Sequence, residues 1–104
     1  MKFIFKVHMF TGHTVDEYAE GWVQASEIMQ RTPGARGTYL HRMIGDPSVA
    51  LAIAHWDSKE ARDRKNDRAH PLVREILERH KGICRIELIG EFDEPEWEVL
   101  PGRS

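Results

Sequence analysis

The sequence predicts an α+β domain whose elements follow the order βαββαβ, and three observations support this order. An amphipathic segment that begins at Thr14 ends at residues 33–37, Pro-Gly-Ala-Arg-Gly, whose glycines permit the positive φ that often closes a helix. A later apolar run ends at Trp56, and Ser58 follows where a helix N-cap belongs. The remaining apolar runs alternate with a period of two, which is typical of strands.

The first strand is predicted over residues 3–10 because apolar side chains recur on both of its faces. Phe3, Phe5, Val7 and Met9 share one face, and Ile4 and Phe10 lie on the other. A helix follows, since Thr14 and Glu17 form a capping-box pattern and apolar residues then recur at helical spacing to about Arg31.

The middle of the chain predicts a β-hairpin, with strands at 37–44 and 49–56 around a turn at 45–48. Ser58 then caps a charged segment, 59–67, whose low apolar content predicts a short exposed helix.

The last third predicts a second long helix and a final strand. His70-Pro71 suits the start of the helix, Gly82 its end, and the expected buried stripe comprises Leu72, Val73, Ile76, Leu77 and His80. Residues 83–92 form the strand, with Cys84, Ile86 and Leu88 on one face.

This order is that of the ferredoxin-like sandwich, a four-stranded antiparallel sheet with two helices on one face. The other face is predicted to carry apolar side chains that would be exposed to solvent in a single subunit: Ile4, Phe10, Leu51, Ile53, Ile83 and Ile89. We therefore expect a homodimer with two sheets packed about a twofold axis. The domain spans 1–92, and the tail 93–104, with Trp97, Val99 and Leu100, is expected to pack on the partner subunit.

Composition limits the classes of partner. The 104 residues make one domain, and 15 Lys and Arg against 17 Asp and Glu form no basic block, which argues against nucleic acid. The apolar N-terminal run is interrupted by Lys6 and His8, too short for a signal sequence or a membrane span. A single cysteine, Cys84, suits a reducing compartment. We therefore expect a cytoplasmic protein without a membrane partner.

The motifs in sequence order carry a family resemblance. A helix, Pro-Gly-x-x-Gly, a strand, an Asp-Pro turn, a strand ending in Trp-x-Ser-x-Glu-Ala and a later histidine occupy residues 3–92. This pattern resembles the antibiotic biosynthesis monooxygenase superfamily. The resemblance implies a dimeric α+β barrel, with a pocket between helices and sheet in which an electron-rich substrate is deprotonated and reacts with O₂ without metal, flavin or other cofactor.

The resemblance also implies roles for individual residues. Trp56 matches the tryptophan that lines the pocket and His70 the histidine of the second helical region, which makes these two the candidate catalytic residues. Haem-degrading relatives carry an asparagine donor where this chain has Val7, and anthrone-type oxygenases carry one where it has Ala52. Neither of these two activities therefore transfers directly. The candidate substrate-binding residues are Tyr18, Trp22, Asn66, Arg42, Phe5 and Val7.

Other interpretations remain beside the monooxygenase. Core packing explains Trp56, Trp22 and Tyr18 equally well, and a helix-capping role explains His70. The chain could be a non-catalytic dimeric small-molecule-binding or stress-associated protein, or thirdly a haem-degrading monooxygenase. No metal site is expected: His8, His41 and His55 would meet only if the strand register allowed it, and structural or pH-sensitive interface roles suit them better.

Overall fold

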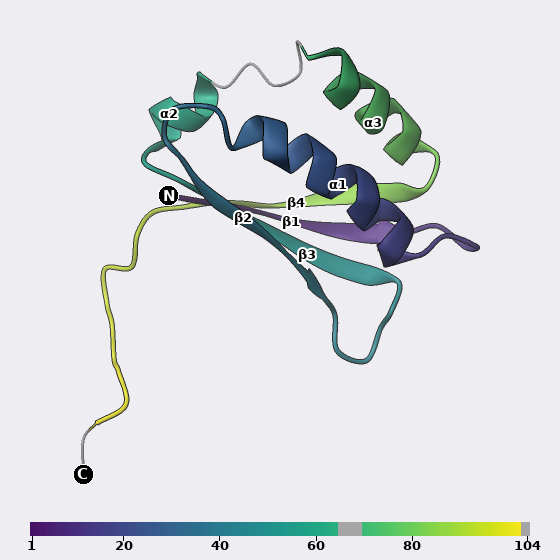
Figure 1. The fold of residues 1–104 in the computed structure, drawn as a ribbon. Coiled ribbons are helices and arrows are strands. Elements are labelled where there is room, and N and C mark those ends of the chain that lie inside the picture. The colour runs from purple at the N-terminus through teal and green to yellow at the C-terminus, as the bar shows by residue number, and fades with distance from the viewer. Residues whose placement is uncertain (65–69, 103–104) are drawn as a thin grey trace.

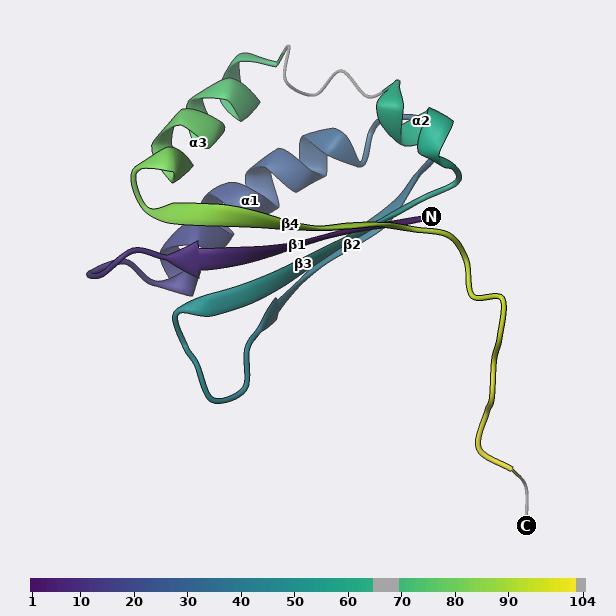
Figure 2. The same ribbon diagram turned by 180° about the vertical axis from the view of Figure 1, so that it is seen from behind.

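The computed structural model describes residues 1–64 and 70–102, and its elements follow the predicted order (Figure 1). They are β1 (Lys2–Met9), α1 (Val15–Met29), β2 (Ala35–Arg42), β3 (Val49–Trp56), α2 (Lys59–Asp63), α3 (Pro71–Lys81) and β4 (Cys84–Phe92). The strands form one antiparallel sheet in the order β2-β3-β1-β4. The helices lie on one face of the sheet (Figures 1 and 2). The predicted α+β fold is therefore confirmed, although β2 begins and ends two residues earlier than expected.

Side-chain caps begin the first two helices. The hydroxyl of Thr14 accepts a hydrogen bond from the Glu17 amide at 3.2 Å, and Ser58 accepts one from the Ala61 amide at 3.1 Å. Only half of the expected capping box forms, because the Glu17 carboxylate pairs with His13 Nδ1 at 2.9 Å. The described part of the charged segment is helical only to Asp63, and the rest of the predicted helix, 65–67, lies outside the described residues.

The third helix begins with His70 as N-cap and Pro71 in the first turn, and it ends at Gly82. Its buried face is narrower than predicted. Val73, Ile76 and His80 are buried, whereas Leu72 and Leu77 are each 39% exposed. Those two leucines flank the buried line at the border of the apolar stripe, where helical spacing alone does not decide burial.

The turn after α1 brings α2 close to the start of β2. Gly34 and Gly37 have positive φ, as the helix-stop motif predicts. A Cβ on Gly34 would stand 2.6 Å from the Cβ of Ala61 in α2, so glycine is needed there for space as well as for φ.

The core lies between the sheet and the helices in two clusters. The larger is built around Val7, Val15, Tyr18, Ala50 and Ile83, and the smaller contains Met1, Ala54, Trp56 and Ala61. The helix-facing side of β3 carries only alanines before Trp56, at positions 50, 52 and 54. Such small side chains leave space above the middle of the sheet.

The opposite face of the sheet is uncovered in the single chain (Figure 2). Ile4, Leu51 and Ile53 lie on it as predicted, joined by Tyr39, whereas Ile89 falls at a register shift between β1 and β4 and has no paired residue. Two predictions for this face are wrong. Ile83 is buried in the core, and Phe10 lines a cavity on the helix side. Both residues lie just outside the strands, where two-residue alternation no longer applies.

The tail leaves the domain beside the N-terminus and runs away from the sheet (Figure 1). The Met1 amino group donates a hydrogen bond to Glu94 at 2.7 Å, and beyond this contact Trp97 is 85% exposed and Val99 97%. Within the described residues, no helix combines the length and apolar character that crossing a bilayer requires.

Candidate functional site

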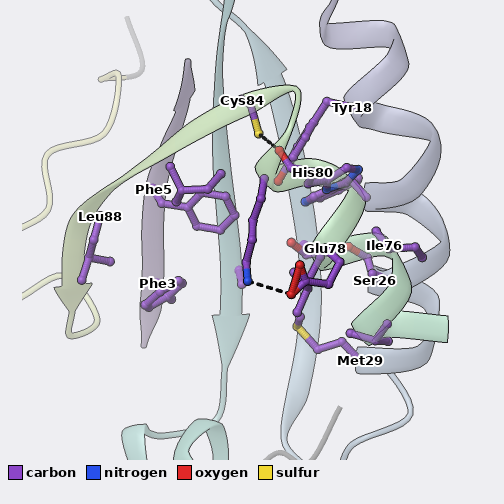
Figure 3. Close-up of a pocket in the computed structure, with 18 of the residues that line it drawn as sticks. Phe3, Phe5, Tyr18, Ser26, Met29, Ile76, Glu78, His80, Cys84 and Leu88 are labelled. Atoms are coloured by element: carbon purple, nitrogen blue, oxygen red, sulfur yellow. Dashed lines mark hydrogen bonds and ion pairs between the residues drawn. The ribbon is translucent and has the colours of Figure 1, made fainter. Parts of the chain in front are cut away.

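A cavity of about 840 Å³ lies between the helices and the sheet. β1 and β4 form its floor, α1 and α3 its sides, and Figure 3 shows side chains from all four reaching into it. Six aromatic residues belong to the lining: Phe3, Phe5, Phe10, Tyr18, Trp22 and Trp56. A cavity of this size and composition suits a flat, largely apolar ligand.

The strand register makes the cavity long. Met9 pairs with Cys84 at one end of β1, and Phe3 pairs with Ala54 near the other end. Met9 lies six positions after Phe3 along the strand, a length of about 20 Å. Trp56 and the Tyr18–Cys84 region therefore line opposite ends of one cavity.

At the Trp56 end, a cation lies against the aromatic wall. The Arg62 guanidinium is 4.0 Å from the centre of the Phe3 ring, and its Nη1 donates to Glu91 Oε1 at 3.0 Å. Its Nε is enclosed without a hydrogen-bond partner. Trp56 itself is buried, and its indole is held among Met1, Ala54 and Ala61.

At the other end, Tyr18, His80 and Cys84 gather (Figure 3). The Tyr18 and His80 rings lie 4.4 Å apart at 35°, and the Cys84 thiol donates to the His80 carbonyl at 3.3 Å. Burial, together with the neighbouring Cys84, raises the pKa of Tyr18 far above its usual value, and burial also raises the pKa of Cys84. Both groups therefore keep their protons at neutral pH.

The imidazole of His80 is buried in a setting that disfavours its charge. Burial lowers its pKa, Arg79 lowers it further, and Glu17 opposes them. Its Nε2 is enclosed and has no hydrogen-bond partner among residues 1–64 and 70–102. His80 is therefore neutral at pH 7, and it brings an unsatisfied nitrogen into the packing between α1 and α3.

Comparison with known proteins finds solved structures with the same fold. No protein-family profile and no curated protein matches the sequence. The structure matches SnoaB, a cofactor-independent oxygenase from Streptomyces nogalater, with a TM-score of 0.76 and 19% identity over 97% of this chain and 96% of that one. Provisionally assigned antibiotic biosynthesis monooxygenases from Chloroflexus aurantiacus J-10-fl and Nitrosomonas europaea match with TM-scores of 0.64 and 0.65.

The chain shares the fold of these three proteins. The Chloroflexus protein is 16% identical over 89% of this chain and 95% of its own, and the Nitrosomonas protein 11% identical over 89% and 100%. The resemblance read from the motifs is thus confirmed in the fold of nearly the whole chain. At these identities the likeness concerns the fold, and activity must be argued from the cavity.

The fold brings four of the eight predicted site residues to the cavity: Phe5, Tyr18, Trp22 and Trp56. Val7 is fully buried beneath it in the core. Arg42 is exposed and pairs with Asp16 at 2.7 Å, away from the lining. His70 is exposed, and its Nδ1 accepts a hydrogen bond from the Leu72 amide at 3.2 Å. Asn66 lies outside the described residues.

Sequence reasoning missed Arg62 and the part played by His80. Arg62 falls in a charged run that looks like a solvated helix face, and His80 is a plausible member of an apolar stripe. One sequence signal for His80 did exist, the glycine in the middle of α1, because a Cβ on Gly21 would lie 2.6 Å from His80 Nε2. A glycine that weakens a helix commonly makes room for a neighbour.

The strand histidines do not meet within one chain. His8 lies opposite Val49 and His55 opposite Lys2, at the two ends of the sheet. His8 Nε2 pairs with Glu87 at 2.7 Å, and the His55 ring meets Tyr39 edge-on at 5.5 Å. In the part of the chain that the structure describes, no three His, Cys, Asp or Glu side chains are grouped to hold a metal ion.

Proposed function

We propose that this protein is a cofactor-independent monooxygenase that oxidises an aromatic or polyketide-like small molecule in the cavity between helices and sheet. The observation that carries the proposal is the long aromatic cavity of about 840 Å³, bordered by Trp22, Trp56 and Phe5. The fold shared with SnoaB supports the same reaction class, since that protein is a cofactor-independent oxygenase.

The chemistry needs only an acidic, electron-rich ring and O₂. A ring methylene gives up one proton, and the carbanion transfers one electron to O₂. The two radicals combine into a peroxide, which takes up a proton and loses water to leave a carbonyl. One O₂ is consumed per ligand, one of its oxygen atoms entering the product and the other leaving as water. The apolar walls strengthen electrostatic contacts to the anion by keeping water away from it.

In this scheme Trp56 orients the ring, and His70 receives the proton through a water, since His70 itself is not among the residues that line the cavity. Trp56 is held rigidly by the core around it, so its indole offers a fixed flat surface. His70 stands one helical turn before Val73 and Arg74, which line the cavity. Since its Nδ1 serves the cap, its Nε2 is left to exchange a proton with solvent at the exposed start of α3.

The proposed assembly is a homodimer joined through the uncovered sheet face. Ile4, Ile53 and Tyr39 form one row across three neighbouring strands on that face. A second sheet packed there would bury this apolar row, and the exposed Trp97 and Leu100 of the tail would pack on the partner subunit.

A non-catalytic ligand-binding protein is the second candidate. It is favoured by Val7 and Ala52, which are buried and apolar where donors were expected, so the sheet offers no hydrogen bond to an anion at those positions. Haem degradation receives no comparable support, because Val7 stands where haem-degrading relatives carry an asparagine on the first strand.

The test measures binding and oxygen uptake on the same preparation. Native mass spectrometry of the gently purified protein reports any retained molecule. An oxygen electrode then follows the metal-stripped, flavin-free protein with an anthrone as probe, beside a Trp22→Leu variant that alters the cavity wall. We expect saturable oxygen uptake at one O₂ per anthrone, reduced in the variant. Saturable binding without oxygen uptake would overturn the enzyme and establish the binding protein.

A further inference from the structure

The end of the cavity opposite Trp56 contains a hydroxyl that forms no hydrogen bond with the residues that the structure describes. Tyr18 is almost fully buried and lines the cavity, and no hydrogen bond between the described residues involves its hydroxyl. The adjacent thiol of Cys84 is already committed to the His80 carbonyl. The Tyr18 hydroxyl is not among the fully enclosed polar atoms that lack a partner, so its donor is open to a ligand in the cavity that Tyr18 lines.

The surroundings of Tyr18 keep it neutral and fixed. Because its pKa is raised by burial, the phenol remains a donor and does not become a competing anion. Its ring packs against the tilted His80 ring at 4.4 Å, and Figure 3 shows both side chains at the same end of the cavity. A neutral hydroxyl held in a dry site is well suited to stabilise an oxyanion that forms on a ligand.

His80 packs against the Tyr18 ring and holds it in place. Two unfavourable features accompany His80 at this position. Its Nε2 has no partner, and α1 carries a glycine in its middle where a Cβ would approach Nε2 to 2.6 Å. A packed core would ordinarily contain an apolar residue in place of His80 and an alanine in place of Gly21. The flat imidazole instead lies between α1 and the Tyr18 ring.

The sheet lacks the donors that the family resemblance leads one to expect, because positions 7 and 52 are Val7 and Ala52. We propose that in this protein Tyr18 on α1 supplies the missing donor to the ligand oxyanion, with His80 as its positioning residue. The ligand class follows from this: a flat, enolisable polycyclic ketone or phenol bound with its acidic oxygen at the Tyr18 end. This inference rests on the proposed function, which it refines.

The experiment compares Tyr18→Phe with Tyr39→Phe, since Tyr39 is the only other tyrosine and lies on the opposite face of the sheet. The probe is an enolisable anthrone whose anion absorbs visible light. A pH titration of the bound probe gives its apparent pKa, and oxygen uptake gives kcat and KM. We expect Tyr18→Phe to raise the bound probe's pKa by about one unit or more and to lower kcat about a hundredfold with little change in KM. Tyr39→Phe should behave as the unaltered protein.

The role of His80 is tested by a double-mutant cycle with Tyr18. His80→Gln keeps a polar side chain of similar length, and His80→Ala removes the stacking partner, with folding of each checked by circular dichroism. If His80 acts through Tyr18, His80→Ala raises the bound probe's pKa in the unaltered protein and changes nothing further in the Tyr18→Phe background. Equal additional shifts in both backgrounds would overturn the positioning role.

The two proposals fail in different ways. If Tyr18→Phe and Tyr39→Phe titrate and turn over alike, the Tyr18 assignment is wrong while the oxygenase stands. If the unaltered protein neither binds the anthrone nor consumes oxygen with it, the proposed function is overturned and the Tyr18 assignment with it. If the probe binds without oxygen uptake and its pKa still depends on Tyr18, the assignment holds for a binding protein.

Discussion

Gly21 in the middle of α1 faces Nε2 of His80 at a distance that leaves no room for a methyl group: a Cβ on residue 21 would stand 2.6 Å from that nitrogen. Ile76 Cγ2 would be 2.9 Å away on the same helix α3. The close approach of α1 to α3 therefore depends on this glycine.

Gly21→Ala should lower the free energy of unfolding by about 1–3 kcal/mol, because overpacking outweighs the gain in helix propensity of about 1 kcal/mol. Urea denaturation measures the change. In a His80→Ala background the clash with the ring is gone and the contact with Ile76 Cγ2 remains, so the same substitution should cost less than in the unaltered protein. A stabilised Gly21→Ala single variant would show that the two helices separate at little cost.

Stability should fall on mild acidification because of His80. The unfolded chain binds a proton near the ordinary histidine pKa of about 6.5, whereas burial holds the folded His80 pKa lower. The unfolded state therefore binds more protons below pH 6.5. His80 therefore makes its full contribution to the free energy of unfolding above pH 6.5, and this contribution is lost as pH falls from 6.5 towards the folded pKa. Denaturant midpoints at pH 7.5, 6.5 and 5.5 test this, with His80→Gln as the control, whose profile should be flatter.

His70 has a capping role that can be separated from a catalytic one. His70→Ala should cost about 1 kcal/mol of stability, since the Leu72 amide loses its acceptor, whereas His70→Ser keeps an N-cap oxygen and the stability with it. If the imidazole takes the substrate proton, both variants should lose about a hundredfold or more in kcat. Full turnover in a stable His70→Ser protein would show that His70 only caps the helix and has no catalytic role.

Ile53 lies in the middle of the uncovered sheet face, between Ile4 and Tyr39. In the proposed dimer Ile53→Glu would bury a charge without a partner, so it should convert the dimer to monomer in analytical ultracentrifugation. Val23→Glu is the matched control, because Val23 is an exposed valine on α1, on the other side of the molecule. A dimer that survives Ile53→Glu but not Val23→Glu would place the interface on the helices.

Removing the tail after Glu94 tests its expected contact with a partner. The shortened chain keeps the hydrogen bond between Met1 and Glu94 and loses Trp97, Val99 and Leu100, which contribute almost nothing to the packing of their own domain. Thermal unfolding at low concentration should therefore change little, while the dimer dissociation constant should rise at least tenfold. An unchanged dissociation constant would show that the tail has no place in the interface.

Local sequence signals predicted the elements well because their causes are local. Thr14, Ser58 and Pro71 determine where helices begin, and Gly34 and Gly37 shape the turn after α1, through interactions within a few residues. Alternation placed the residues of β1 and β3 on the correct faces, and it failed for Phe10 and Ile83, which lie beyond the ends of the strands. The buried stripe of α3 was predicted too wide, because Leu72 and Leu77 lie at the border of the apolar face, where helical spacing alone does not decide burial.

The lining of the cavity was predicted only in part. Phe5, Tyr18, Trp22 and Trp56 were identified because bulky apolar side chains on helix and strand faces point to the same interior. His80 and Arg62 were not, since their environments are made by residues far away in the chain: His80 by α1, Arg62 by Phe3 and Glu91 on two strands. Arg42 was assigned to the pocket but pairs with Asp16 at the outside of the fold.

The sequence by itself determined the order of the elements, their caps and turns, and the α+β fold, because propensity, capping and periodicity act between residues close in the chain. Only the tertiary structure decided that one long cavity joins Trp56 to Tyr18, that His80 is enclosed against Gly21, and that Val7 lies beneath the cavity and does not line it. Those facts depend on strand register and on how closely two helices approach, which are set by side-chain volumes meeting across the core.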